Sequence, residues 1–337
     1  MKIGIVNALP SSVDALRRAL EFRPQHQIAW VARDSDHAIE MCARETPDVV
    51  LMDLDIPGSD GVEATRRIMT ATPCAILIVT ARVDANTARV FDAMGHGAID
   101  AVDTPAFSTS DPQAAAATFL QKIDTISKLI GTRRFIPNAD TFGDTWVLKK
   151  RDRLVAIGAS AGGPAAVKQV LSGLSRNFQA AIVIIQHVDE RFAPGMAEWL
   201  SRESPLQVRV AKEGDRPAVG TALLAGSNDH LVFKAVDRLG YTAEPREQAY
   251  RPSVDVFFES VSKHWPGDAV GVLLTGMGRD GAKGLKTLRA KGHYTIAQDE
   301  ATSAVYGMPK AAATLGAAVD ILPLARIAQR LIDTFSH

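Results

Sequence analysis

The sequence predicts an α/β protein of two domains. Short apolar runs alternate with segments of helical periodicity, and this alternation is interrupted once along the chain. The interruption, residues 131–152, loses the periodicity and gains charge, as linkers between domains do. A length of 337 residues also favours two domains over one. We therefore expect a first domain over residues 1–125, a linker over 126–152 and a second domain over 153–337.

Five strand–helix repeats predict a parallel, doubly wound sheet for the first domain. The expected strands are residues 3–6, 28–31, 49–52, 76–79 and the region around Val102. The expected helices are residues 11–22, with Ser11 or Ser12 as the N-cap, 35–45, 61–71 and a closing helix over 111–130. Ligands of such folds bind at the carboxyl ends of the strands, which makes Asp53, directly after the third strand, a candidate functional residue.

The second domain repeats the alternation. Its expected strands include residues 154–157, 181–185 and 270–274, and a helix is expected from about Pro164. Helical segments flank each of these runs, so we expect a mostly parallel sheet here too.

The composition excludes several classes of protein. Hydrophobic residues make up 46% and charged residues 23% of a chain whose formal net charge is zero. Without a basic cluster, nucleic acid and anionic membranes are poor partners, and no apolar run is long enough for membrane insertion. Cys42 and Cys74 are the only cysteines, in no metal-binding pattern. We expect a cytoplasmic protein.

The segment Gly158-Ala-Ser160-Ala-Gly162 matches the G-x-S-x-G nucleophile elbow, between an expected strand and an expected helix. Nucleotide-binding loops have a similar composition. A dinucleotide fingerprint, however, would need glycine at position 160, and the Gly-Lys-Ser/Thr of a Walker loop is absent from the sequence.

Two further residues complete a serine hydrolase set. His187 follows the apolar run that ends at Ile185, and Asp280 lies in a glycine-rich loop after another expected strand. A nucleophile, a base and an acid at strand ends are the parts needed for acyl transfer through a serine. His230 is the second candidate for the base. The order Ser-His-Asp differs from the Ser-Asp-His order of α/β-hydrolases.

Four segments resemble the chemotaxis-type receptor methylesterases, the CheB family, in that family's order. They are Ile157-Gly-Ala-Ser-Ala-Gly-Gly-Pro164, Gln186-His-Val188, Tyr250-Arg-Pro-Ser-Val-Asp255 and Leu273-Leu-Thr-Gly-Met-Gly-Arg-Asp-Gly281. The resemblance covers nearly the whole chain. It implies a flavodoxin-like receiver domain followed by a catalytic methylesterase domain.

The resemblance also implies a reaction and roles for residues. Ser160 would be the nucleophile, His187 the general base and acid, Asp280 the orienting carboxylate, and the Met277 backbone N–H an oxyanion donor. The implied reaction is hydrolysis of γ-glutamyl methyl esters on a methyl-accepting chemoreceptor, without a cofactor. Some relatives also deamidate receptor glutamines.

For the first domain, the segment from Asp53 to Gly61 resembles that of response-regulator receivers. The resemblance implies that Asp53 accepts a phosphoryl group from a CheA-type histidine kinase, with Mg²⁺ present. Thr80, at the end of the next strand, would be the switch residue. The receiver would then cover the groove around Ser160 until Asp53 is modified.

The receiver segment departs from the family's pattern at three positions. Asn7 and Ala8 replace an acid pair that would hold Mg²⁺, and Thr104 replaces a lysine. Asp55 could compensate in part for the lost acids. Phosphorylation at Asp53 is therefore an open question at this point, with a slow receiver or a fixed inhibitory lid as the alternatives.

The Asp103-Thr-Pro105 variant, together with Phe91-Asp-Ala-Met-Gly-His-Gly-Ala98, most resembles the methylesterases of Wsp-type surface-sensing systems.

Two other hypotheses for the function of the chain stay open. One is a non-catalytic signalling module that only binds partners, which intact Ser160, His187 and Asp280 disfavour. The other is a general esterase of small molecules, which the receiver disfavours.

Overall fold

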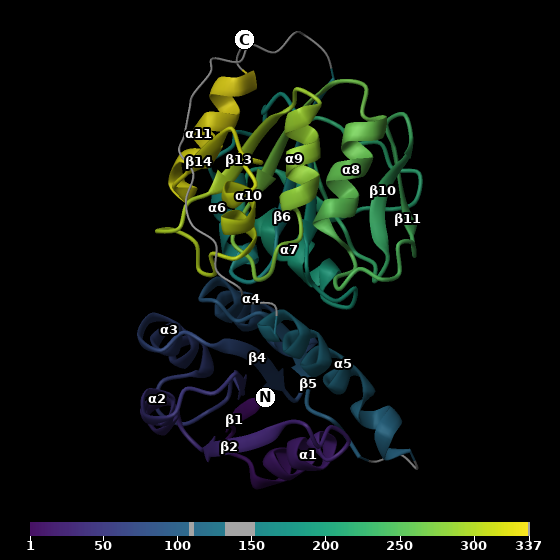
Figure 1. Cartoon of the computed structure of the whole chain (residues 1–337). Coiled ribbons are helices and arrows are strands. Elements are labelled where there is room, and N and C mark those ends of the chain that lie inside the picture. Colours follow the sequence, from purple (N-terminus) through teal and green to yellow (C-terminus); the bar gives the residue numbers. More distant parts are fainter. Residues whose placement is uncertain (108–110, 132–151, 336–337) are drawn as a thin grey trace. The chain divides into compact units, whose positions relative to one another are not determined.

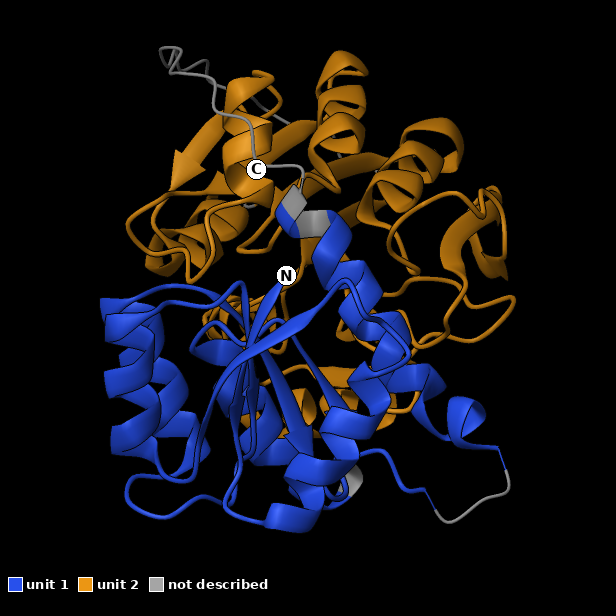
Figure 2. Cartoon of the chain, turned by 60° about the horizontal axis from the view of Figure 1, so that its bottom comes forward, with its two compact units in different colours: residues 1–134 blue, residues 135–337 orange. Residues whose placement is uncertain are grey.

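A computed structural model gives the fold and describes residues 1–107, 111–131 and 152–335. The chain forms two compact units, Met1–Arg134 and Phe135–His337 (Figure 2). Of the predicted linker, residues 132–151 lie outside the described residues, and residues 126–131 are the end of a helix.

Unit 1 alternates strands and helices, as Figure 1 shows. Its elements are β1 (Lys2–Val6), α1 (Pro10–Leu20), β2 (Gln27–Ala32), α2 (Ser35–Arg44), β3 (Val49–Met52), α3 (Gly61–Ala71), β4 (Ala75–Thr80), a 3₁₀ turn (Asp84–Asn86), α4 (Thr87–Gly95), β5 (Asp100–Asp103) and α5 (Pro112–Gly131).

The sheet of unit 1 has five parallel strands in the order β2-β1-β3-β4-β5. Helix α1 packs against α5, while α2 packs on α3 and α3 on α4. The predicted parallel, doubly wound sheet is confirmed. Its strand order reverses between β1 and β3, the position at which folds of this type bind ligands.

One detail of the prediction is wrong. Helix α1 begins at Pro10 with Leu9 as its N-cap, so Ser11 and Ser12 lie inside the first turn and cap nothing. Proline suits the first helical position because its φ angle is already helical and its missing N–H would have had no partner there.

Unit 2 has a larger sheet. Its elements are β6 (Arg153–Ala159), α6 (Gly163–Ser172), β7 (Ala181–Gln186), α7 (Ala193–Glu203), β8 (Gln207–Val210), β9 (Thr221–Leu224), β10 (His230–Ala235), β11 (Arg238–Thr242), α8 (Val254–His264), β12 (Asp268–Leu273), α9 (Ala282–Ala290), β13 (Tyr294–Gln298), α10 (Met308–Thr314), β14 (Asp320–Leu322) and α11 (Leu324–Phe335).

The sheet of unit 2 has seven parallel strands in the order β14-β13-β12-β6-β7-β9-β8, and β10 and β11 form a separate antiparallel hairpin. The mostly parallel sheet predicted for this domain is confirmed. Within the described residues, no helix is both long and apolar enough to cross a membrane.

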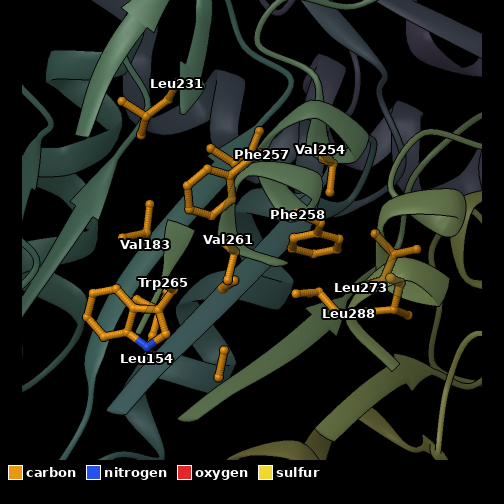
Figure 3. Close-up of a cluster of buried hydrophobic side chains, with 14 of the residues drawn as sticks. Leu154, Val183, Leu231, Val254, Phe257, Phe258, Val261, Trp265, Leu273 and Leu288 are labelled. Atoms are coloured by element: carbon orange, nitrogen blue, oxygen red, sulfur yellow. The ribbon is translucent and has the colours of Figure 1, made fainter. Parts of the chain in front are cut away.

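Helix α8 is anchored by the core of unit 2. Its Phe257, Phe258 and Val261 are fully buried among side chains of the sheet, of the hairpin and of α9 (Figure 3). Burying such side chains stabilises the fold by roughly 1.5–3 kcal/mol each. The first turn of α8 is therefore held in a fixed place.

Candidate active site

Ser160, His187 and Asp280 come from three neighbouring strands of the unit 2 sheet. Strand β6 lies between β12 and β7. The chain leaves β6 towards β7 and returns later to β12 on the other side, so the strand order reverses at β6. Ser160 directly follows β6, His187 directly follows β7, and Asp280 lies between β12 and α9. The carboxyl ends of strands at such a reversal form the crevice in which α/β sheets bind ligands.

The backbone of Ser160 is held by hydrogen bonds on two sides. Its N–H donates to the Thr275 carbonyl at 3.0 Å. Its carbonyl accepts from the Gln186 side chain at 2.9 Å and from the Gly163 N–H at 2.7 Å. Gly162 continues the turn into α6 with a φ of +76°, a conformation that favours glycine. Only 2% of Ser160 is exposed, so its position is set by the sheet and not by a free loop.

The loop after β12 passes directly against the Ser160 side chain. A Cβ atom on Gly276 would lie 2.8 Å from the Ser160 Cβ, so glycine is required at this close approach. The next residue is Met277, whose backbone N–H has no hydrogen-bond partner in the described parts of the chain. An unpaired N–H beside the serine is what an oxyanion donor needs.

His187 continues the pairing of β6 with β7, because its N–H donates to the Ala159 carbonyl at 3.1 Å. Its ring Nε2 lies 2.8 Å from Asp280 Oδ2. An ionised carboxylate only accepts hydrogen bonds, so Nε2 carries the proton and Nδ1 has the free lone pair. Nδ1 is buried and has no partner among the described residues.

Asp280 lies at the N-terminus of α8 and accepts three more hydrogen bonds there. The Ser253 hydroxyl donates to Oδ1 at 2.8 Å, the Val254 N–H to Oδ2 at 2.7 Å and the Asp255 N–H to Oδ1 at 3.0 Å. Burial raises the pKa of Asp280, but the His187 hydrogen bond and these backbone donors outweigh burial and hold the pKa below its ordinary value. The carboxylate is therefore kept charged.

Asp255, whose N–H donates to Asp280, has a pKa shifted in the opposite direction. Its carboxylate accepts from the Gly284 N–H at 2.8 Å. Burial and the charge of Asp280 raise the pKa of Asp255 to about 6. Two neighbouring acids thus have separated pKa values, and the one that contacts His187 is the stronger acid.

Sequence reasoning missed Tyr250. Its ring stacks on that of His187, with centroids 3.9 Å apart and planes 12° from parallel. Tyr250 lies in one of the four segments that carried the family resemblance, but the loop before α8 has no periodicity that could have indicated its contact. The stacking leaves the imidazole little freedom to rotate.

His230, the second candidate for the base, has another role. It is fully buried; its Nδ1 accepts from the Ser253 N–H at 3.0 Å, and its Nε2 lies 3.1 Å from the Pro245 carbonyl, to which it donates. Both ring nitrogens are occupied by backbone groups, so His230 has no atom left for proton transfer with a substrate. It supports Ser253, which in turn holds Asp280.

In unit 1, Asp53 lies at the reversal between β1 and β3 and is 8% exposed. The Asn7 side-chain N–H donates to Oδ2 at 3.0 Å and the Asp55 N–H to Oδ1 at 3.3 Å. Burial raises the pKa of Asp53, and the backbone donors offset this only in part. Asp53 is therefore a weaker acid than Asp280.

The residues around Asp53 do not fit a Mg²⁺ ion, which prefers oxygen ligands. Asn7 turns an N–H group towards Asp53, Ala8 has no ligand atom, and the Asp55 carboxylate is bound by Arg89 at 2.6 Å. Across the described residues, no three acidic, histidine or cysteine side chains cluster in a way that could hold a metal.

Thr80 is the last residue of β4, and Thr104 directly follows the neighbouring strand β5. The Thr80 hydroxyl accepts from the Asn86 side chain at 3.1 Å, and its carbonyl accepts from the Thr104 N–H at 2.9 Å. The place of the family's lysine is thus taken by a residue with no positive charge, and the cation near Asp53 is Arg89, which also donates to the Leu54 carbonyl at 2.7 Å.

Comparison with known proteins gives matches along both units. Residues 155–331 match the family model described as CheB methylesterase, and residues 3–109 match the response regulator receiver domain. A protein-glutamate methylesterase/protein-glutamine glutaminase of Pseudomonas aeruginosa is 58% identical, over 99% of this chain and 100% of the relative. A protein with the same description from Mesorhizobium japonicum is 55% identical, over 99% and 98%.

Among solved structures, the CheB methylesterase catalytic domain of Thermotoga maritima is similar to this chain. The TM-score is 0.52 with 32% identity, and the match covers 54% of this chain and 98% of that domain.

Proposed function

This chain belongs to the CheB methylesterase family, and we propose that it hydrolyses glutamate methyl esters of a chemoreceptor with Ser160 as the nucleophile. The observation that carries the proposal is the His187–Asp280 hydrogen bond. It leaves Nδ1 of His187 unpaired, on a residue adjacent to Ser160 across paired strands. Neighbouring strands are about 4.8 Å apart, within reach of a serine and a histidine side chain.

The proposed steps follow from these positions. Ser160 Oγ attacks the ester carbonyl carbon while His187 Nδ1 takes the hydroxyl proton, and the negative charge on the carbonyl oxygen faces the Met277 N–H. The bond from carbon to the methoxy oxygen then breaks, and His187 returns the proton to release methanol. Water enters, gives a proton to His187 and attacks the acyl-enzyme. Glutamate leaves, and the serine regains its proton.

Asp280 acts through His187 in this scheme. Its charge stabilises the imidazolium that forms while the ring holds the serine proton, and its hydrogen bond keeps the lone pair on Nδ1. The low pKa of Asp280 supports this role, because the carboxylate stays ionised throughout.

Glutamine deamidation is a second proposed activity, favoured by the names of the relatives. The same acyl-enzyme forms from a glutamine side chain, with ammonia in place of methanol as the leaving group. His187 would protonate the nitrogen as it leaves.

The receiver domain makes a CheA-type histidine kinase the proposed partner, with Asp53 as the phosphoryl acceptor and Thr80 as the residue that responds. Asn7, Ala8 and Thr104 predict a weak response. The Wsp-type assignment belongs to this proposal as well.

The test is methanol release from a methylated receptor signalling fragment. We expect release by the wild type and by Ser175→Ala, a matched change at an exposed serine, and none by Ser160→Ala. Release by Ser160→Ala at the wild-type rate would overturn the assignment. Binding of the fragment without release by the wild type would favour a binding module, and hydrolysis of small esters alone would favour a general esterase.

The receiver is tested by repeating the assay with Mg²⁺ and a small-molecule phosphodonor. Unchanged methanol release would mean that Asp53 does not regulate the enzyme by phosphorylation.

A further inference from the structure

A hollow of about 480 Å³ lies on the surface of unit 2, along helix α9. We call it the α9 groove; it is lined by Lys283, Lys286, Thr287, Ala290, Lys291 and Leu315. The five residues contributed by α9 and its C-cap are spaced at three, four, seven and eight residues from Lys283, which places them on one face of the helix.

Three lysines give the groove an unbalanced positive charge. Lys283, Lys286 and Lys291 are exposed, and no ion pair involves them among the residues that the structure describes. Elsewhere in the unit, Lys168 and Lys234 pair with glutamates. In a chain of zero net charge, three unpaired cations around one hollow favour an acidic partner.

The groove also has an apolar side. Leu315 is 40% exposed, one of few large hydrophobic side chains that unit 2 leaves so open. Ala290 also lines the groove, and the aliphatic stems of the lysines add apolar surface below their charges. A partner with acidic side chains around one apolar side chain would match both features.

The wall that carries Leu315 is fixed in place. Arg289, also on α9, donates to the carbonyls of Gly316 and Ala318, both at 2.8 Å. These bonds hold the turn after α10 against α9, so the groove is formed before any partner arrives. A preformed groove binds with a smaller loss of conformational entropy than a mobile one.

One end of the groove lies in the first turn of α9, close to Asp280 in the sequence. Lys283 is three residues after Asp280, and the lysine face runs from there to Lys291, a length of about 12 Å at the rise of an α-helix. Acidic residues spaced three or four apart on another helix would face lysines with this spacing. Nucleic acid fits less well, because the lining has no arginine and no aromatic residue to stack on bases.

We propose that the α9 groove binds an acidic helical segment of the protein substrate and so presents its ester to Ser160. This inference rests on the proposed methylesterase function and names the surface that selects a protein substrate over a small ester. Ion pairs between these lysines and acidic residues of the substrate would affect KM and make KM depend on salt, because ions screen the attraction between exposed charges.

The first experiment reverses the charge of the groove with Lys283→Glu, Lys286→Glu and Lys291→Glu together. We expect KM for the methylated receptor fragment to rise about tenfold or more and its dependence on salt to reverse or disappear. Hydrolysis of a small glutamate methyl ester should stay within about twofold of the wild type, since these side chains do not contact the reacting groups. Arg176→Glu, Lys212→Glu and Arg326→Glu together make the same charge change at exposed residues elsewhere in the unit and should leave both substrates unaffected.

A second pair of variants tests the apolar side. Leu315→Ser should raise KM for the fragment a few-fold. Val219→Ser, which changes another exposed aliphatic residue of unit 2, should not. Equal KM values for all four variants and the wild type would overturn the proposal, as would a loss of small-ester hydrolysis as large as the loss with the fragment.

Binding without turnover separates this proposal from the proposed function. In a Ser160→Ala background, fluorescence anisotropy of the labelled fragment measures affinity whether or not the chain is an esterase. Weaker binding by the charge-reversed groove would support the groove even if no methanol were released. Displacement of the fragment by single-stranded DNA at comparable concentration would overturn selectivity for an acidic helix.

Discussion

Asp280 and Asp53 occupy equivalent places in the two sheets and have opposite acid strengths. Each lies near the carboxyl end of a strand at a reversal of strand order, and each is largely buried. The pKa of Asp280 is below its ordinary value, whereas that of Asp53 is above it. Burial is the largest influence on both, so burial does not explain the difference.

The difference comes from the hydrogen-bond donors. Asp280 accepts from His187, from the Ser253 hydroxyl and from two N–H groups at the start of α8. Asp53 accepts from one amide side chain and, at 3.3 Å, from the Asp55 N–H. A helix N-terminus with a hydroxyl cap lowers the pKa of a buried carboxylate below its ordinary value, whereas one amide and one long N–H bond do not offset burial.

Removing the charge of Asp280 should have the largest effect. In Asp280→Asn the partner of His187 Nε2 is neutral and can itself donate, which favours the wrong tautomer of the ring. By analogy with the same change in serine proteases, kcat should fall by about 10³–10⁴-fold. Asp255→Asn, at the neighbouring acid that contacts Gly284 and not His187, should keep most of the activity. Single-turnover methanol release measures both, and a loss below tenfold in Asp280→Asn would contradict the scheme.

Weakening the donors around Asp280 should have a smaller effect. Ser253→Ala removes the hydroxyl that donates to Asp280 and that caps α8 by accepting from the Val256 N–H. We expect a loss of about 1 kcal/mol in the free energy of unfolding and about tenfold in kcat. Ser253→Thr should restore both. As a control, Asp34→Ala removes the cap of α2 in unit 1 and should lower stability without lowering kcat. If kcat of Ser253→Ala equalled that of the wild type, Ser253 would serve only as a helix cap.

The pH dependence of Ser253→Ala has a definite sign. The folded-state pKa of Asp280 is depressed, so its ionisation stabilises the fold above the unfolded pKa and the benefit is lost as pH falls through the folded pKa. Loss of the Ser253 hydroxyl moves that folded pKa upward. Thermal melts on the acid side should therefore begin to fall at a higher pH in the variant than in the wild type.

Adding an acid beside Asp53 tests whether a carboxylate at residue 7 would create a Mg²⁺ site there. Asn7→Asp replaces the amide donor with a carboxylate, and excess Mg²⁺ at about tenfold its Kd would raise the Tm of unit 1 by about 4 °C. The wild type and Asn7→Ala should show no such shift. A comparable Mg²⁺ shift in the wild type would show that Asp53 and Asp55 bind the ion without the missing acids.

Removing the charge of Asp53 should give the smallest effect. The pKa of Asp53 is higher in the folded protein than in the unfolded chain. Ionising Asp53 therefore lowers the free energy of unfolding; this cost begins as pH rises above the ordinary aspartate pKa, and it is complete above the folded pKa. Asp53→Asn should raise the Tm of unit 1 by a few degrees at pH 7, with no gain below about pH 4. Asp14→Asn, at an exposed acid of α1, should change little. A lower Tm for Asp53→Asn at pH 7 would mean that Asp53 is more strongly held than its donors indicate.

Much of the fold could be predicted because buried parallel strands are continuous apolar runs. The predicted strand at residues 49–52 agrees with β3, and the run ending at Ile185 agrees with β7 to within one residue. Knowing where the strands before His187 and Asp280 end was enough to predict both residues at strand ends of the second domain. The start of α1 could not be read correctly, because Pro10 can begin a helix without a side-chain cap.

The surroundings of the site were harder to predict. Ser253, His230 and Tyr250 come from the hairpin and the loop before α8, segments that have no periodicity linking them to Asp280 or His187. Their contacts depend on how α8 is packed by its core side chains (Figure 3). The pKa of Asp280 depends on these contacts too, so its direction could not be predicted from the sequence.

The backbone bonds of Ser160 have a consequence for how the enzyme would lose activity on heating. Its amide proton is bonded to the loop after β12 and its carbonyl to the side chain of Gln186, the last residue of β7, so Ser160 is tied to the strands on both sides of β6. Local opening would not expose it. The Ser160 amide should exchange with deuterium as slowly as the core of the sheet, and heat inactivation should coincide with the unfolding of unit 2 and not precede it.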